Sequence, residues 1–176
     1  MGDRCMSRGD GELEGRQFSR ACDSYLAATD HYWLALSRAN RHVPERRVLA
    51  DAHVSAFRAA LPLLSHPAAP FDLNIDQDRV TGYVFCPSPG ADLFRPVIWA
   101  VGRGTTAESS YRQVALTILG SDLACAVYSV EVSRRHQTAA DHPLSAPALE
   151  CAVVQWVQEQ PGVDPDVEPL LAPNNS

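Results

Sequence analysis

Lysine is absent from this chain of 176 residues, so all 15 of its basic residues are arginine. The arginines are scattered, and Arg46–Arg47 and Arg134–Arg135 are the only adjacent pairs. Nucleic-acid binding typically needs a basic stripe interleaved with aromatic side chains, which this sequence lacks. The 21 acidic residues bring the formal charge to −6. We therefore expect no nucleic-acid partner.

Paired cysteines are also missing, because no C-x-x-C occurs among the five cysteines. This excludes zinc ribbons and thioredoxin-like redox motifs. Gly102-x-Gly104 is too short for a dinucleotide-binding loop, which needs a third glycine. No apolar run reaches the length of a signal peptide or a membrane span. We expect a cytoplasmic protein with free thiols, no metal, no cofactor and no membrane partner.

Helical periodicity begins only after a charged, glycine-containing segment, residues 1–16, which we expect to be disordered. Apolar residues then recur at three- and four-residue steps over 18–36 and again over 48–61. These two stretches predict a helical hairpin within residues 17–68, ended by the prolines that follow.

The rest of the chain has the pattern of an α/β sheet. Two segments alternate apolar and polar residues like a hairpin of half-buried strands, and two later segments are continuously apolar like strands buried on both faces. A helix between the buried strands predicts a parallel crossover, for which Thr105 or Thr106 is the candidate N-cap. The expected strands are 71–75, 79–86, 96–101, 124–130 and a poor strand at 167–172, and the expected helices are 107–119 and 144–157.

Short motifs in this region resemble one branch of the α/β-hydrolases. Gly82-Tyr83, Arg95-Pro96, and Gly102 to Tyr111 with Thr106 and Glu108 fall in the order and spacing of that branch. It contains the FrsA-like esterases and the 2,6-dihydroxypseudooxynicotine hydrolases, with the dipeptidyl aminopeptidase-like enzymes nearby. The resemblance implies the strand order 1-2-4-3-5, a helical cap-like segment and hydrolysis of an ester, amide or carbon–carbon bond in a small acyl substrate.

The catalytic serine of this fold is missing from the sequence. It lies on a G-x-S-x-G elbow, followed along the chain by an acid and a histidine. No G-x-S-x-G occurs here, and residues 171–176 stand where it belongs. We therefore expect a partial (truncated) α/β-hydrolase sheet in residues 71–176, preceded by the helical hairpin, with no catalytic residues for a serine triad. The alternative is a non-catalytic binding or assembly subunit.

The resemblance also implies a functional site. Gly102, Arg103 and Gly104 are the counterpart of the oxyanion turn, in which N–H groups face developing negative charge. For Arg103 the structural alternative is an exposed turn side chain, and for Glu108 it is a favourable position near a helix N-terminus. Four residues are candidates for a substrate pocket, although the aromatic ones also fit a helical core: Glu108, Tyr111, His31 and Tyr32.

Two further predictions follow from the residues alone. His136, Asp141 and His142 are close enough in sequence for a base with its carboxylate or for metal ligands, but their polar loop favours solvent exposure. If residues 167–172 form no strand, Pro96–Val101 becomes an apolar sheet edge. Such an edge predicts pairing with a second copy or with a protein partner.

Overall fold

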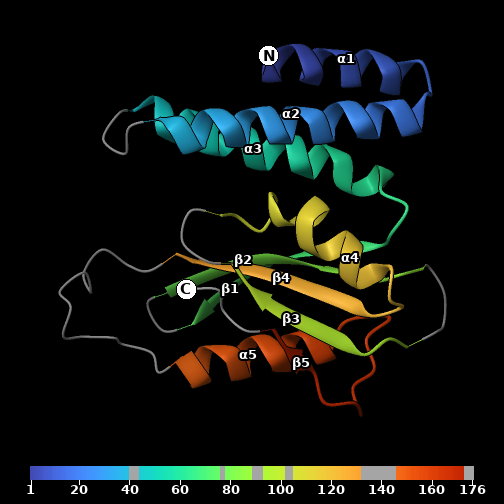
Figure 1. Ribbon diagram of the computed structural model, residues 1–176, viewed down its shortest axis with the longest axis vertical. Helices are drawn as coiled ribbons and strands as arrows, with labels where there is room; N and C mark the ends of the chain where they lie inside the picture. Colours follow the sequence, from blue (N-terminus) through green and yellow to red (C-terminus); the bar gives the residue numbers. More distant parts are fainter. Residues whose placement is uncertain (40–43, 76–77, 89–92, 102–104, 132–145, 173–176) are drawn as a thin grey trace. The chain divides into compact units, whose positions relative to one another are not determined.

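The computed structural model describes residues 1–39, 44–75, 78–88, 93–101, 105–131 and 146–172. The chain divides into two compact units, Met1–Ser65 and His66–Ser176. We call them the helical unit and the sheet unit (Figure 1) and describe each by itself.

The described residues of the helical unit form three α-helices and one short 3₁₀ turn. Two of the helices, α2 and α3, form the hairpin that the sequence predicts. The third, α1, occupies the segment for which composition predicts disorder, so the structure differs from that prediction. The elements are α1 (Gly2–Glu14), α2 (Phe18–Arg38), α3 (Glu45–Ala60) and η1 (Leu61–Leu63).

Helix α1 is held on α2 by a glycine, an aspartate and a tyrosine. A Cβ on Gly9 would lie 2.6 Å from the Tyr25 ring, so only glycine lets the ring come this close. The Tyr25 hydroxyl donates a hydrogen bond of 2.8 Å to Asp10 Oδ1. Tyr25 is 2% exposed, so its ring has little room to move away.

The same arrangement recurs one heptad earlier on α1. A Cβ on Gly2 would lie 2.7 Å from the Tyr32 ring, and the Tyr32 hydroxyl donates a 2.5 Å hydrogen bond to Asp3 Oδ1. Between the two pairs, Cys5 is buried against Ala28 of α2 and Ala56 of α3. We call these two contacts together the clasp: Gly2 and Asp3 of α1 with Tyr32 of α2, and Gly9 and Asp10 of α1 with Tyr25 of α2. The clasp orders a segment for which composition alone predicts disorder.

The sheet unit has a five-stranded mixed sheet with the order β1-β2-β4-β3-β5. β1 and β2 form an antiparallel hairpin, β4 pairs antiparallel with β2 and parallel with β3, and β5 pairs parallel with β3. This order confirms the one implied by the resemblance. The strands are β1 (Ala68–Ile75), β2 (Asp78–Phe85), β3 (Pro96–Ala100), β4 (Ala124–Glu131) and β5 (Leu170–Leu171).

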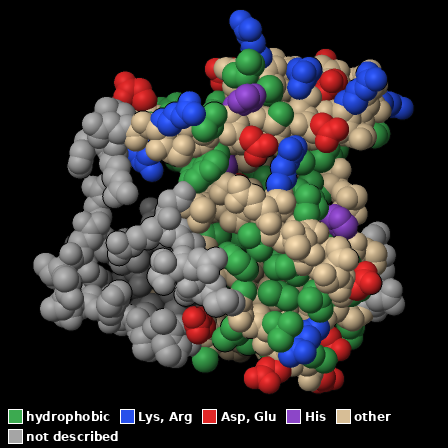
Figure 2. Space-filling view, in the orientation of Figure 1, with side chains coloured by type: hydrophobic (Ala, Val, Ile, Leu, Met, Phe, Trp, Pro, Cys, Tyr) green, Lys and Arg blue, Asp and Glu red, His purple; other side chains and the backbone are tan. Residues whose placement is uncertain are grey.

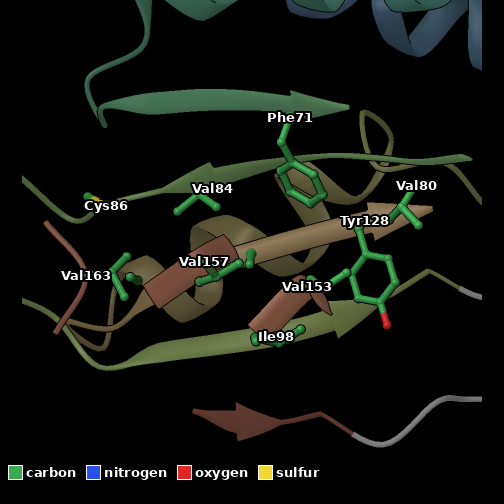
Figure 3. Packing of buried hydrophobic residues seen from close by; sticks show 11 residues of the cluster. Phe71, Val80, Val84, Cys86, Ile98, Tyr128, Val153, Val157 and Val163 are labelled. Atoms are coloured by element: carbon green, nitrogen blue, oxygen red, sulfur yellow. The ribbon is translucent and has the colours of Figure 1, made fainter. Parts of the chain in front are cut away.

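Helices cover both faces of this sheet. The segment η2 (Tyr111–Ala115) with α4 (Leu116–Leu119) joins β3 to β4, and α5 (Ala146–Gln158) precedes β5 on the other face (Figure 1). The α5 side holds an apolar core in which Val153 and Val157 of α5 face the sheet (Figure 3). Phe71 packs on Trp156, with ring centroids 4.6 Å apart. Since both faces are covered, β4 is buried from Ala124 to Tyr128, as its continuous apolar run predicts.

The poor strand predicted at 167–172 is present, although it is only two residues long. β5 pairs with Val97 and Ile98, and the Ala172 N–H adds a 3.0 Å hydrogen bond to the Ile98 carbonyl. β5 therefore covers the edge of β3 over Val97–Ile98, so the open edge that we predict in the absence of this strand does not occur there. The sheet ends instead on Leu170 and Leu171, which are 40% and 56% exposed.

Replacing Gly9 with alanine tests the clasp. We expect Gly9→Ala to lower the free energy of unfolding by roughly 1–2 kcal/mol, because the methyl group overlaps a ring that is buried and hydrogen-bonded. Gly11→Ala is the matched control on the same helix, since a Cβ there has nothing within 4 Å. It should raise stability by roughly 0.5–1 kcal/mol through helix propensity. Denaturant unfolding measures both, and equal effects would contradict the clasp.

Alkaline pH should open the clasp. Burial, the hydrogen bond to aspartate and the aspartate charge raise the pKa of Tyr25 and of Tyr32 from 10.0 to about 12. A folded-state pKa above the unfolded value means that this stability is fully present below pH 10 and is lost as pH rises through 12. Tyrosinate absorbance should show both groups titrating late. Asp3→Asn with Asp10→Asn should move both pKa values down, and no movement would argue against these contacts.

Candidate functional site

The carboxyl end of β3 is where the sheet passes the chain to the following helix, and such ends typically hold the sites of α/β folds. The Val101 N–H donates a 2.9 Å hydrogen bond to the Tyr128 carbonyl, so pairing with β4 continues to the last described residue before the turn. Gly102, Arg103 and Gly104 lie outside the described residues. Their assignment as the oxyanion turn stays a prediction.

The chain resumes in a turn closed by reciprocal hydrogen bonds. The Thr106 N–H donates to Ser109 Oγ at 3.0 Å, and the Ser109 N–H donates to Thr106 Oγ1 at 3.1 Å. Ser110 Oγ also donates to the Thr106 carbonyl at 2.9 Å. This is the logic of a capping box, in which two orphan donors are satisfied together. Thr106, one of the two predicted N-caps, makes these bonds within the turn, whereas the N-cap of the helical segment itself is Ser110, whose side chain makes no capping bond.

The helix predicted over 107–119 differs from a regular α-helix. Residues 107–109 form a turn, and Tyr111–Ala115 have π-helical hydrogen bonding before α4 begins. Single π-helical turns are rare and often lie at functional sites. Here the wider turn accompanies the burial of Tyr111 and Ala115.

Tyr83 of β2 is the neighbour that fixes this turn. Its hydroxyl donates a 2.8 Å hydrogen bond to Glu108 Oε1, and Tyr83 itself is 3% exposed. Phe85, two residues along the same strand face, lies 6.0 Å from the Tyr83 ring and 5.1 Å from the Tyr111 ring. Glu108 and Tyr111, two of the candidate pocket residues, therefore share one aromatic cluster.

The role of Tyr83 was not predicted from the sequence. The available signals were its motif partner Gly82 and the two-residue period of β2, which puts Tyr83 and Phe85 on one face. Gly82 has a physical reason of its own, since a Cβ there would lie 2.3 Å from the Val127 carbonyl oxygen. The glycine lets β2 and β4 approach closely and so places Tyr83 beside the turn.

Arg95 of the Arg95-Pro96 motif and a glycine, Gly162, connect the segments next to β3 and β5. Arg95 Nε donates a 2.9 Å hydrogen bond to the Glu168 carbonyl, two residues before β5. Gly162 has φ +82°, a backbone conformation that favours glycine, and its carbonyl accepts the Phe94 N–H at 2.9 Å. These residues keep β5 beside β3, which is a structural role.

The other two pocket candidates belong to the helical unit and are described there. His31 and Tyr32 are half-buried on α2 of the helical unit, where Tyr32 bonds to Asp3. A pocket joining them to Glu108 and Tyr111 stays a prediction. The loop residues His136, Asp141 and His142 lie outside the described residues.

Thiol and metal chemistry have little support among the described residues. All five cysteines are free, and burial raises the pKa of Cys86 and brings that of Cys125 to about 12, which disfavours the nucleophilic thiolate. No three metal-binding side chains gather within the described ranges.

Within those same ranges, no helix has the length and apolar character needed to cross a membrane. On the face in Figure 2, the arginines and acids that the structure describes are interspersed.

Comparison with known proteins supports the fold. The crystal structure of the 2,6-dihydroxy-pseudo-oxynicotine hydrolase matches with a TM-score of 0.74 at 20% identity, over 97% of this chain and 48% of that one. AbyA5 matches with a TM-score of 0.59 at 14% identity, over 90% of this chain and 44% of that one. No family model and no curated protein matches the sequence.

These likenesses define the class of fold. The chain has an α/β-hydrolase fold, with helices followed by a five-stranded mixed sheet. It spans about half the length of each of the two solved structures.

Removing the Tyr83 hydroxyl should loosen the turn at Glu108. We expect Tyr83→Phe to lower the free energy of unfolding of the sheet unit by about 1 kcal/mol, because Glu108 loses a buried donor while ring packing is kept. Tyr128→Phe on β4 is the matched control, since it also removes the hydroxyl of a buried tyrosine in the sheet unit, whereas the bond to Glu108 comes from Tyr83. Hydrogen exchange at residues 105–110 should rise in the first variant only, and equal exchange in both would exclude Tyr83 as the anchor.

Proposed function

We propose that this chain provides the front half of an α/β-hydrolase scaffold and has no serine-triad catalysis by itself. The observation that carries the proposal is the turn at Thr106–Ser109, between β3 and η2, which the Tyr83–Glu108 hydrogen bond and the reciprocal Thr106–Ser109 bonds hold in place. In this fold an acyl substrate is held at that end, and the adjoining backbone N–H groups stabilise the oxyanion.

The proposed substrate class rests on the resemblance of the sequence motifs, and the neighbour's printed name, which is that of a hydrolase, supports it. The proposed chemistry is hydrolysis of an ester, amide or carbon–carbon bond beside a carbonyl in a small acyl substrate. The N–H of Arg103 is the proposed oxyanion donor. Glu108 and Tyr83 act as positioning residues, since they hold the turn that follows.

Two observations support the lack of a nucleophile in these 176 residues. The sequence contains no G-x-S-x-G. Cys125 and Cys86, both in the sheet unit, have thiol pKa values raised by burial and are poorly suited to replace the missing serine. Five free thiols also support a reducing, cytoplasmic location.

A non-catalytic assembly subunit is the second candidate function. The exposed leucines of β5 favour it, because parallel strands are normally covered on both faces and flanked by neighbours. β5 pairs with β3 at Val97 and Ile98 only. The proposed partner, a second copy or another protein, pairs along this edge with β5 and with the part of Pro96–Val101 that β5 leaves uncovered.

Ester hydrolysis with covalent labelling tests the first proposal. The chain alone should hydrolyse a p-nitrophenyl ester no faster than buffer and should take no fluorophosphonate label. Refolding it together with the other half of the 2,6-dihydroxy-pseudo-oxynicotine hydrolase should produce a labelled serine on that half.

The control is the same mixture made with Tyr83→Phe, whose loosened turn should lower the restored rate several-fold while labelling persists. Labelling of this chain in isolation would overturn the absence of a nucleophile. A mixture that binds tightly without hydrolysis would favour the assembly subunit.

A further inference from the structure

The turn between α1 and α2 holds a strained residue. The Gln17 N–H donates to the Glu12 carbonyl at 2.8 Å and the Arg16 N–H to the Leu13 carbonyl at 2.9 Å, which is the Schellman ending of a helix. The residue at its left-handed position is Arg16, with φ 56°. Glycine is the usual residue there, because a Cβ crowds the following carbonyl.

Helix α1 has little tendency to form alone. It has 13 residues, of which Gly2, Gly9 and Gly11 are glycine, and isolated helices of this length are marginal even without glycine. Its order therefore comes from the surface of α2. That surface offers two tyrosine rings and their hydroxyls, one heptad apart.

The segment that fits this surface is defined by its chemistry. It must be helical, carry glycine over each tyrosine ring and place an aspartate next to each glycine. Gly2-Asp3 and Gly9-Asp10 meet these requirements, and every copy of the chain carries them. A second copy therefore presents the same α1 to the same α2.

We propose that α1 is exchanged between two copies of this chain, each α1 docking on the α2 of the other to form a swapped dimer. The clasp contacts are identical in the closed monomer and in the dimer, so they do not favour one over the other. The hinge, residues 15–17, favours the dimer, because an extended chain there releases Arg16 from the left-handed conformation. Short strained hinges promote such exchange.

Hinge variants test the exchange through light scattering after size exclusion. The native chain should show a concentration-dependent monomer–dimer equilibrium. Arg16→Gly relaxes the closed hinge by a factor of roughly 5–30 in each chain and, because the dimer has two hinges, should raise the dimer dissociation constant roughly 25- to 900-fold. Arg16→Ala, which keeps the Cβ, should leave it nearly unchanged. A native chain that stays monomeric at every concentration, or equal constants for the two variants, overturns the proposal.

Deleting Gly15 and Arg16 is a second hinge test, because it prevents α1 from folding back. The deletion variant should be dimeric throughout, with α1 amides protected from hydrogen exchange. A folded monomer with unprotected α1 contradicts exchange, and near-UV circular dichroism establishes whether the variant is folded. If it does not fold, the two Arg16 variants still decide.

A pair of complementary variants identifies the contact itself. Gly9→Ala places a methyl group on α1, and Tyr25→Ala opens space for it on α2. When the two chains are mixed, native mass spectrometry should show the one-to-one heterodimer at several times the statistical share. A purely statistical mixture means that dimerisation uses another surface, and this excludes the swap.

Discussion

Strand β4 is the constraint on which the sheet unit depends, because it must pair antiparallel with β2 on one side and parallel with β3 on the other. Five consecutive residues of the strand, Ala124 to Tyr128, are buried, and three of them are alanine or cysteine. Small side chains let η2 and α4 cover one face and α5 the other. At Gly82 the neighbouring strand comes so close that no side chain fits. The candidate site follows from this approach, since it sets the position of Tyr83.

The elements of the sheet unit were largely predictable, because their signals are local. The alternation in 71–75 and the continuous apolar run of 124–130 are properties of short windows, and a strand's burial determines both. Strand order is not local. It came from the resemblance carried by Gly82-Tyr83 and Arg95-Pro96, whose structural roles at β4 and β5 explain why those residue types occur there.

Composition failed for α1 because the stabilising information lies on another helix. Glycine lowers helix propensity, so Gly2 and Gly9 indicate a loop when residues 1–16 are considered alone. Only beside Tyr25 and Tyr32 do they become positions where nothing larger fits. The seven-residue spacing is present in both segments, between Gly2 and Gly9 and between Tyr25 and Tyr32. Recognising it required knowing that the two segments lie antiparallel.

The site was half predictable for a similar reason. Glu108 and Tyr111 were singled out and do lie in one cluster, but Glu108 was given a helix-dipole role. Its hydrogen bond runs to Tyr83, 25 residues earlier, on a strand that reaches it only through the pairing of β2 with β4. Window-based reasoning cannot detect a contact that depends on sheet topology. The same limit applied to β5, whose two residues are held by Arg95 and by pairing with β3.

The two units are stabilised by different kinds of contact, and this difference determines how each responds to change. The sheet unit buries its apolar residues on both faces of β4, so one lost polar contact leaves most of its stability intact. α1 relies on close packing of glycine against tyrosine and on three hydroxyl–carboxylate hydrogen bonds, the third from Ser24 to Glu12, with Cys5 as its buried apolar residue. Few buried apolar contacts mean a low free energy of local opening. We therefore expect α1 to open before the rest of the helical unit, and opening is the step that exchange between two copies requires.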